Sequence, residues 1–135
     1  LYHEYTHVLV RKIADDKAPW WLNEGLAETL SNELSSDQLF QLAQACQEDR
    51  LFALSQLEDN QLESLDKDSL GLAYIQAHAT VRYLTTRFSA NAMNQFLFAL
   101  AQGSAPEEAL AQVYRRNYRL LEKEVAGTYA RAAAR

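Results

Sequence analysis

Two histidines and a glutamate near the start of the chain have the spacing of a zinc site. His3, Glu4 and His7 form the pattern H-E-x-x-H. On a helix, residues four positions apart lie on the same face, so both imidazoles can bind one zinc ion at the usual Zn–N distance of roughly 2.0–2.1 Å. Glu4 lies about 100° around the helix from His3, where its carboxylate reaches a metal-bound water. The pattern predicts two metal ligands and a carboxylate within reach of the metal-bound water.

A second motif supplies the third ligand. Residues 19–28 read P-W-W-L-N-E-G-L-A-E and follow a short polar turn. A catalytic zinc ion takes three protein ligands and keeps one position for water, and two histidines with one glutamate are a common set. The separation between His7 and Glu24 allows a helix, a turn and an antiparallel return. Gly25 indicates close helix packing beside the ligand, and Glu28, one turn beyond Glu24, can accept the second ring N–H of a ligand histidine.

HEYTH at residues 3–7 followed by PWWLNEGLAE at residues 19–28 resembles the gluzincin zinc metallopeptidases of the thermolysin-like clan. The closest resemblance is to the bacterial peptidase-MA-like domains. Residues 73–84 and 96–110 are similar to the helices that follow the metal site in those domains, so the resemblance covers most of the chain. It implies peptide-bond hydrolysis by water that one bound Zn²⁺ ion activates. The roles it implies are zinc ligands for His3, His7 and Glu24, general base and acid for Glu4, and hydrogen-bond partner of a ligand histidine for Glu28.

The resemblance also implies a role for an aromatic residue farther along the chain. Tyr74 is the candidate to donate a hydrogen bond to the oxyanion of the tetrahedral intermediate, and its alternative role is that of a core aromatic on a helix. His78, one helical turn beyond Tyr74, either assists or lies on the surface, and we expect it on the surface. Trp20 and Trp21 are expected to close the core beneath the metal rather than to contact substrate.

The pattern of apolar residues predicts an all-α fold, a bundle of about six helices in one domain over residues 1–135. No segment alternates apolar and polar residues for long enough to predict a strand. Asn23, the pair Ser35 and Ser36, Ser89 and Ser104 are the expected helix caps, and residues 48–69 are expected to form a loop with short turns. The predicted helices cover residues 1–14, 23–33, 36–47, 70–88, 90–102, 105–113 and 118–133.

Composition excludes several classes of function. The chain has 135 residues, of which 48% are hydrophobic and 23% charged, with a net charge of −5. This balance provides no field that attracts nucleic acid or an anionic membrane, and no apolar run is long enough to span one. The basic residues between 115 and 135 and the acidic ones between 48 and 68 are expected to form solvated faces. The one cysteine, Cys46, excludes an intramolecular disulfide and leaves the compartment open.

Three functions stay open on the sequence alone. The first is a zinc peptidase that acts on a peptide or protein substrate. The second is a non-catalytic binding or scaffold module derived from one, and the third is a helical interaction domain with a chance motif. Gluzincin domains carry a β-sheet before the H-E-x-x-H helix, whereas this chain begins two residues before His3. We therefore expect the helical part of such a domain, inert if the sheet is required, and a homodimer through the face that the sheet would cover.

Overall fold

The computed structural model describes residues 10–15, 17–59 and 61–130, which form helices and contain no strand. This confirms the predicted all-α fold for that part of the chain. Residues 10–14 are helical, as expected for the end of the first helix. The remaining elements are α2 (Trp20–Ser31), α3 (Ser36–Gln47), η1 (Leu54–Leu57), η2 (Gln61–Ser64), α4 (Lys67–Arg87), α5 (Ala90–Ala101), α6 (Pro106–Tyr114), α7 (Tyr118–Val125) and η3 (Ala126–Ala130).

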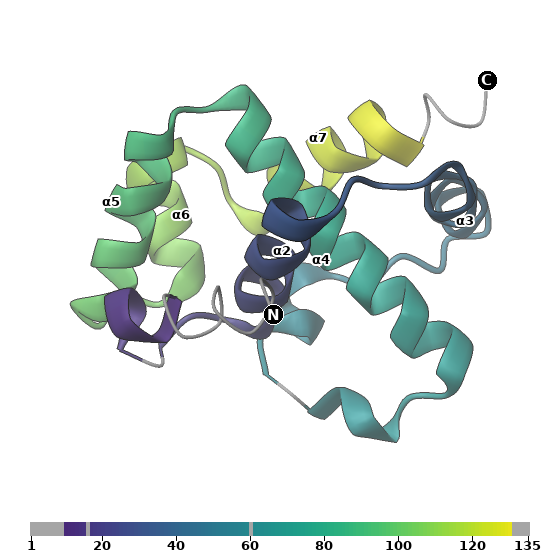
Figure 1. Ribbon diagram of the computed structural model, residues 1–135, viewed down its shortest axis with the longest axis horizontal. Coiled ribbons are helices and arrows are strands. Elements are labelled where there is room, and N and C mark those ends of the chain that lie inside the picture. The colour runs from purple at the N-terminus through teal and green to yellow at the C-terminus, as the bar shows by residue number, and fades with distance from the viewer. Residues whose placement is uncertain (1–9, 16, 60, 131–135) are drawn as a thin grey trace.

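Helix α4 is the centre of the arrangement, and α2 packs along it (Figure 1). Helices α5 and α6 form a pair at one end of the molecule, while α3 lies at the other end and packs against η3. From Leu72 to Leu84, all but two residues of α4 are buried. A helix that is buried on nearly all sides needs apolar or small residues all round, which α4 provides with alanine, leucine, isoleucine and valine. It is therefore a rigid support for the helix that packs on it.

Ser35 and Ser89 cap their helices as expected, whereas Ser36 is the first residue of α3 and not a cap. The Ser35 hydroxyl accepts a hydrogen bond from the Gln38 amide (3.1 Å), and the Gln38 side chain accepts one from the Ser35 amide (2.9 Å). Ser89 caps α5 through the amide of Ala92 (3.1 Å). Helix α4 begins at Lys67, three residues earlier than expected, because the Asp66 carboxylate accepts from the amide of Ser69 (2.7 Å).

The other two predicted caps are wrong. Asn23 lies inside α2, which begins at Trp20, because the amide of Trp20 donates to the backbone carbonyl of Glu58 (2.8 Å). An acceptor from a distant loop thus takes the place of a side-chain cap. Ser104 does not cap α6 either. That helix begins at Pro106, whose ring supplies the helical φ without a donor to satisfy.

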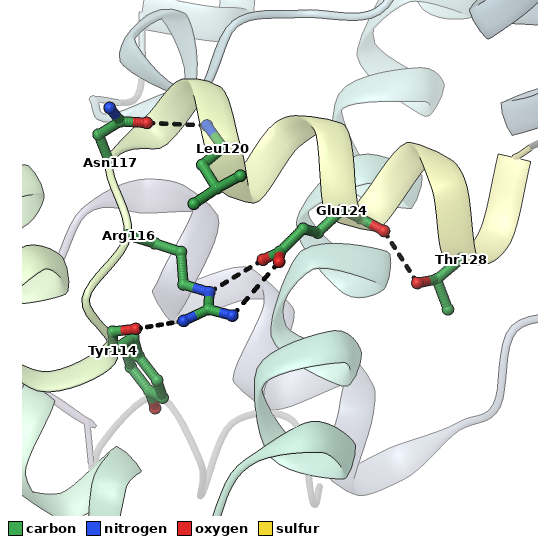
Figure 2. A network of polar contacts seen from close by, with 6 residues as sticks. All are labelled: Tyr114, Arg116, Asn117, Leu120, Glu124 and Thr128. Atoms are coloured by element: carbon green, nitrogen blue, oxygen red, sulfur yellow. Dashed lines mark hydrogen bonds and ion pairs between the residues drawn. The ribbon is translucent and has the colours of Figure 1, made fainter.

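The turn between α6 and α7 is fixed by polar contacts (Figure 2). The Arg116 guanidinium donates two hydrogen bonds to the carboxylate of Glu124 (3.0 and 3.3 Å) and one to the carbonyl of Tyr114 (2.8 Å). Asn117 caps α7 by accepting from the amide of Leu120 (2.8 Å). These contacts join the end of α6 to the last turn of α7, and the Asn117 cap fixes the first residue of α7, Tyr118.

Tyr118 connects α7 to the start of α2. Its hydroxyl donates to the carboxylate of Glu58 (2.6 Å) and accepts from the indole N–H of Trp21 (3.3 Å). Burial, followed by the hydrogen bond to Glu58, raises the pKa of Tyr118, so the phenol stays a donor. Glu58 also accepts the amide of Trp20 through its backbone carbonyl. Trp21 is fully buried, as expected for a residue that closes the core. Tyr118 and Glu58 therefore anchor the first turn of α2.

Tyr118→Phe is expected to lower the free energy of unfolding by about 1–3 kcal/mol, because it removes the buried donor to a carboxylate and leaves the Trp21 N–H without its acceptor. Urea unfolding measures this loss as a lower midpoint concentration, with the dependence of the free energy of unfolding on urea unchanged. Tyr114→Phe is the matched control, since the buried Tyr114 hydroxyl has no hydrogen-bond partner among the described residues. The control is expected to change stability little or to increase it. If Tyr118→Phe and Tyr114→Phe lowered the free energy of unfolding equally, the hydrogen bonds of Tyr118 would not stabilise the start of α2.

Candidate functional site

Helices α2 and α4 lie side by side and run in the same direction. The ring of Trp20, the first residue of α2, packs edge to face on the ring of Tyr74, two turns into α4, with their centroids 5.0 Å apart. Just beyond the end of α2, the carboxylate of Glu33 accepts from the Arg82 guanidinium on α4 (3.2 Å). Residue numbers therefore increase together along both helices. Each turn of α2 faces a fixed turn of α4.

Gly25 sets the close approach of the two helices. A Cβ atom at this position would overlap Val81 Cγ2 and the backbone carbonyl of Ala77. Any side chain larger than hydrogen would therefore push α2 away from α4. This confirms the expectation that Gly25 permits close helix packing next to Glu24. The predicted ligand thus lies on a helix whose distance from α4 is fixed by backbone contact.

Two rows of polar and aromatic side chains follow this interface. Trp20, Glu24, Glu28 and Asn32 occupy every fourth position of α2 and its C-cap, and residues at this spacing share one helix face. Tyr74, His78 and Arg82 form the corresponding row on α4. The interface therefore combines carboxylate, imidazole, phenol and guanidinium groups. It is the candidate site.

Tyr74 lies at the open end of the two rows. Its side chain is 40% exposed, which excludes the alternative of a core residue. Burial of part of the ring raises the pKa of Tyr74, and the charges of Glu24 and Glu28 raise it further. Both carboxylates are thus close enough to act on the phenol, which remains a hydrogen-bond donor at neutral pH. Trp20 is half-buried against Tyr74 at the rim of the site, unlike the fully buried Trp21.

His78 is buried, with 2% of its surface exposed, so the expectation of a surface histidine is wrong. The reason is its position on α4, where it faces the end of α2 rather than solvent. Desolvation lowers the pKa of His78. Glu28 and a backbone hydrogen bond with Asn32 oppose that change, and Arg82 adds to it. The net direction favours a neutral imidazole at neutral pH.

The two carboxylates differ in their surroundings. Glu28 accepts a hydrogen bond at Oε2 from the side-chain amide of Asn32 (3.2 Å), which orients it. Glu24 is partly buried, and its Oε2 atom is shielded from solvent. A carboxylate oxygen that is shielded from solvent and lies beside a second carboxylate is a suitable ligand for a cation such as Zn²⁺. The described residues therefore fit the glutamate part of the predicted zinc site.

The remaining predicted site residues, His3, Glu4 and His7, lie outside the described residues. Within 10–15, 17–59 and 61–130, no group of three or more histidine, cysteine, aspartate or glutamate side chains is placed to hold a metal ion. The described part of the chain thus contributes one predicted ligand, Glu24, and the groups around it. The complete ligand set stays a prediction.

Sequence reasoning missed two members of this site. Asn32 orients Glu28, and Arg82 continues the α4 row. The signal that would have found both is the four-residue spacing, because Asn32 follows Glu28 and Arg82 follows His78 by one turn.

Comparison with known proteins gives one match. The family model of the peptidase MA superfamily matches residues 1–128, which is nearly the whole chain. No curated protein and no solved structure matches it. In the part of the chain that the structure describes, no helix is long and apolar enough to cross a membrane. The match includes the H-E-x-x-H residues and both helices of the candidate site, so the chain belongs to the peptidase MA superfamily.

Proposed function

We propose that this chain is the helical part of a zinc-dependent peptidase, in which water hydrolyses a peptide bond. The observation that carries the proposal is that Glu24 and Glu28 share the face of α2 with Trp20, whose ring packs against Tyr74 of α4, in a chain of the peptidase MA superfamily. The sequence contributes H-E-x-x-H at residues 3–7. The interface supplies a shielded carboxylate and a protonated phenol, which are the groups that such a reaction needs from these helices.

In this proposal, His3, His7 and Glu24 hold the zinc ion. When bound, zinc supplies the positive charge that activates water and polarises the peptide carbonyl. Glu4 accepts a proton from the attacking water on a carboxylate oxygen and delivers it to the departing amine. No serine or cysteine nucleophile takes part.

Tyr74 and Glu28 act on either side of the ligand Glu24. The Tyr74 hydroxyl donates a hydrogen bond to the substrate carbonyl oxygen as negative charge develops on it. Its raised pKa favours this role, because the proton stays on the phenol at neutral pH. Glu28, oriented by Asn32, accepts a ring N–H from a ligand histidine and so fixes the tautomer of that histidine.

Two measurements test the proposal. Metal analysis of the purified chain is expected to find one zinc ion per molecule, and a labelled protein substrate is expected to be cleaved in a zinc-dependent manner. Turnover is measured on this chain and, where the gene encodes a longer protein, on that protein. Stoichiometric zinc without cleavage by either form would favour the binding or scaffold module. Absence of zinc from both would contradict the proposal.

Tyr74→Phe is expected to lower kcat by roughly 10²-fold with little change in KM, because it removes a hydrogen bond that forms fully only as charge develops on the substrate oxygen. Zinc content is expected to stay the same. Tyr129→Phe, on η3, is the matched control and is expected to keep the parent kcat. An unchanged kcat in Tyr74→Phe would remove Tyr74 from the mechanism.

A further inference from the structure

A cavity of about 400 Å³ lies between α3, α4 and α7, and no residue of α2 lines it. Gln76 and Thr80 line it from α4, and each is two positions away from His78. Two positions are about 200° of rotation around a helix, so the cavity and the row of Tyr74, His78 and Arg82 lie on opposite faces of α4. Small-molecule sites have volumes of roughly 300–1,000 Å³, a range that includes this cavity.

Hydrogen bonds fix the wall of the cavity that residues 51–54 form. The buried Gln76 side chain accepts from the amide of Phe52 (2.7 Å) and donates to its carbonyl (3.0 Å). The amide of Leu54 donates to the carboxylate of Glu122 on α7 (2.7 Å). One side chain from α4 and one from α7 thus hold the same segment. The wall is formed before any ligand enters, so a ligand does not have to order it.

The cavity has an apolar floor and a charged rim. Asp49 lies on the rim just after the end of α3, whereas Arg119 and Lys123 are one turn apart on α7. All three are exposed, and none of their side chains makes a hydrogen bond or ion pair within the part of the chain that the structure describes. The floor consists of buried apolar side chains, namely Leu42, Leu54, Val125 and Ala126.

The separation of these charges indicates the chemistry of a ligand. A carboxylate is complementary to Arg119 and Lys123, an ammonium group to Asp49, and an aliphatic body to the floor. Glu122, the remaining charged residue of the cavity, already accepts the Leu54 amide. A fatty carboxylate would leave Asp49 without a partner, and a simple amine would leave both cations without one. A ligand with both charges matches all three groups.

We propose that this cavity binds a small apolar zwitterion, namely a free α-amino acid with an aliphatic side chain or a short peptide of such residues. The two share an ammonium group, a carboxylate and an aliphatic body. The inference goes beyond the proposed function and does not rest on it, because the cavity uses no residue of the candidate site.

Titration of the intact ¹⁵N-labelled chain with leucine and with leucyl-leucine tests the proposal and distinguishes the two sources. The amide signals of Leu54 and Ala126 are expected to shift to saturation, while that of Leu100 in α5 stays in place. Tighter binding of leucine identifies the free amino acid, and tighter binding of leucyl-leucine identifies the peptide. A chelator is expected to leave both affinities unchanged. If neither probe shifts the cavity amides, or if binding requires zinc, the proposal is wrong.

Three analogues separate the parts of the ligand. 4-Methylpentanoate lacks the ammonium group and leucinamide lacks the carboxylate, so each is expected to bind about 3–10-fold more weakly than leucine. Glycine keeps both charges without an aliphatic side chain and is expected not to shift the cavity amides. Binding of 4-methylpentanoate as tight as that of leucine would refute the ammonium site.

Variants of the rim assign each charge to its partner. Asp49→Asn is expected to weaken leucine and leucinamide about 3–10-fold and to leave 4-methylpentanoate unchanged. The double variant Arg119→Gln with Lys123→Gln is expected to weaken leucine and 4-methylpentanoate and to leave leucinamide unchanged. Lys67→Gln and Asp68→Asn, exposed in the first turn of α4, are the matched controls and are expected to bind all three like the parent. Equal effects of a rim variant on all three ligands, or no effect on any, would overturn the assignment.

Discussion

Replacement of Glu24 by glutamine is expected to weaken zinc binding by more than the roughly 10–100-fold that a group outside the ligand set contributes. Zinc prefers the anionic carboxylate over a neutral amide, and the shielded position of Glu24 Oε2 leaves little room for water to replace it. Competition titration with a chelator measures the affinity. Peptide turnover is expected to disappear with the metal.

Two further variants make this result specific. Glu4→Gln is expected to retain zinc while lowering turnover by about 10²–10⁴-fold, since it removes the general base and keeps all three ligands. Glu33→Gln makes the same change of side chain just beyond α2, where the carboxylate is 84% exposed, and is expected to alter neither property. If Glu24→Gln and Glu4→Gln lost zinc to the same extent, the assignment of Glu24 as ligand and Glu4 as general base would be wrong.

Gly25→Ala is expected to destabilise the fold by about 1–3 kcal/mol or more, which is the usual range for an overpacked core. The added Cβ would overlap Val81 Cγ2 and the Ala77 carbonyl, and the carbonyl belongs to the backbone of a buried helix that cannot move aside. Separation of α2 from α4 would also displace Glu24 from Tyr74. We therefore expect lower zinc affinity in the fraction that folds. Urea unfolding with and without zinc measures both effects.

Gly71→Ala is the matched control for this substitution. Gly71 lies in α4, and a Cβ atom there meets nothing within 4 Å. Alanine favours the helix over glycine by up to about 1 kcal/mol, so the control is expected to be as stable as the parent or more so. A Gly25→Ala protein as stable as Gly71→Ala would show that the helices are not in contact at this residue.

The sequence predicted the fold where local chemistry determines it. Ser35 and Ser89 cap helices because their hydroxyls reach amides three residues ahead, which is a short-range property. The start of α2 was mistaken because its acceptor is the carbonyl of Glu58, far away in the chain. No local pattern records such a contact. Helix existence was thus predictable, whereas one helix boundary depended on tertiary structure.

The candidate site also has features that the sequence predicted and one that it did not. The pattern around Glu24 predicted the tight packing at Gly25, because a glycine on a helix that packs against another helix has a simple steric meaning. The burial of His78 was not predictable from α4 alone. That helix is buried on nearly all sides, so its sequence has no polar face to distinguish contact with α2 from contact with solvent. His78 is buried because α2 packs against that part of α4.

The anchor between Trp21 and Tyr118 has a consequence during protein synthesis. The two residues are 97 positions apart, so a nascent chain lacks the support for the first turn of α2 until α7 has left the ribosome. At about 5–20 residues per second, that interval lasts roughly 5–20 s. Under the proposed function, metal loading of Glu24 would then follow the emergence of α7 from the ribosome.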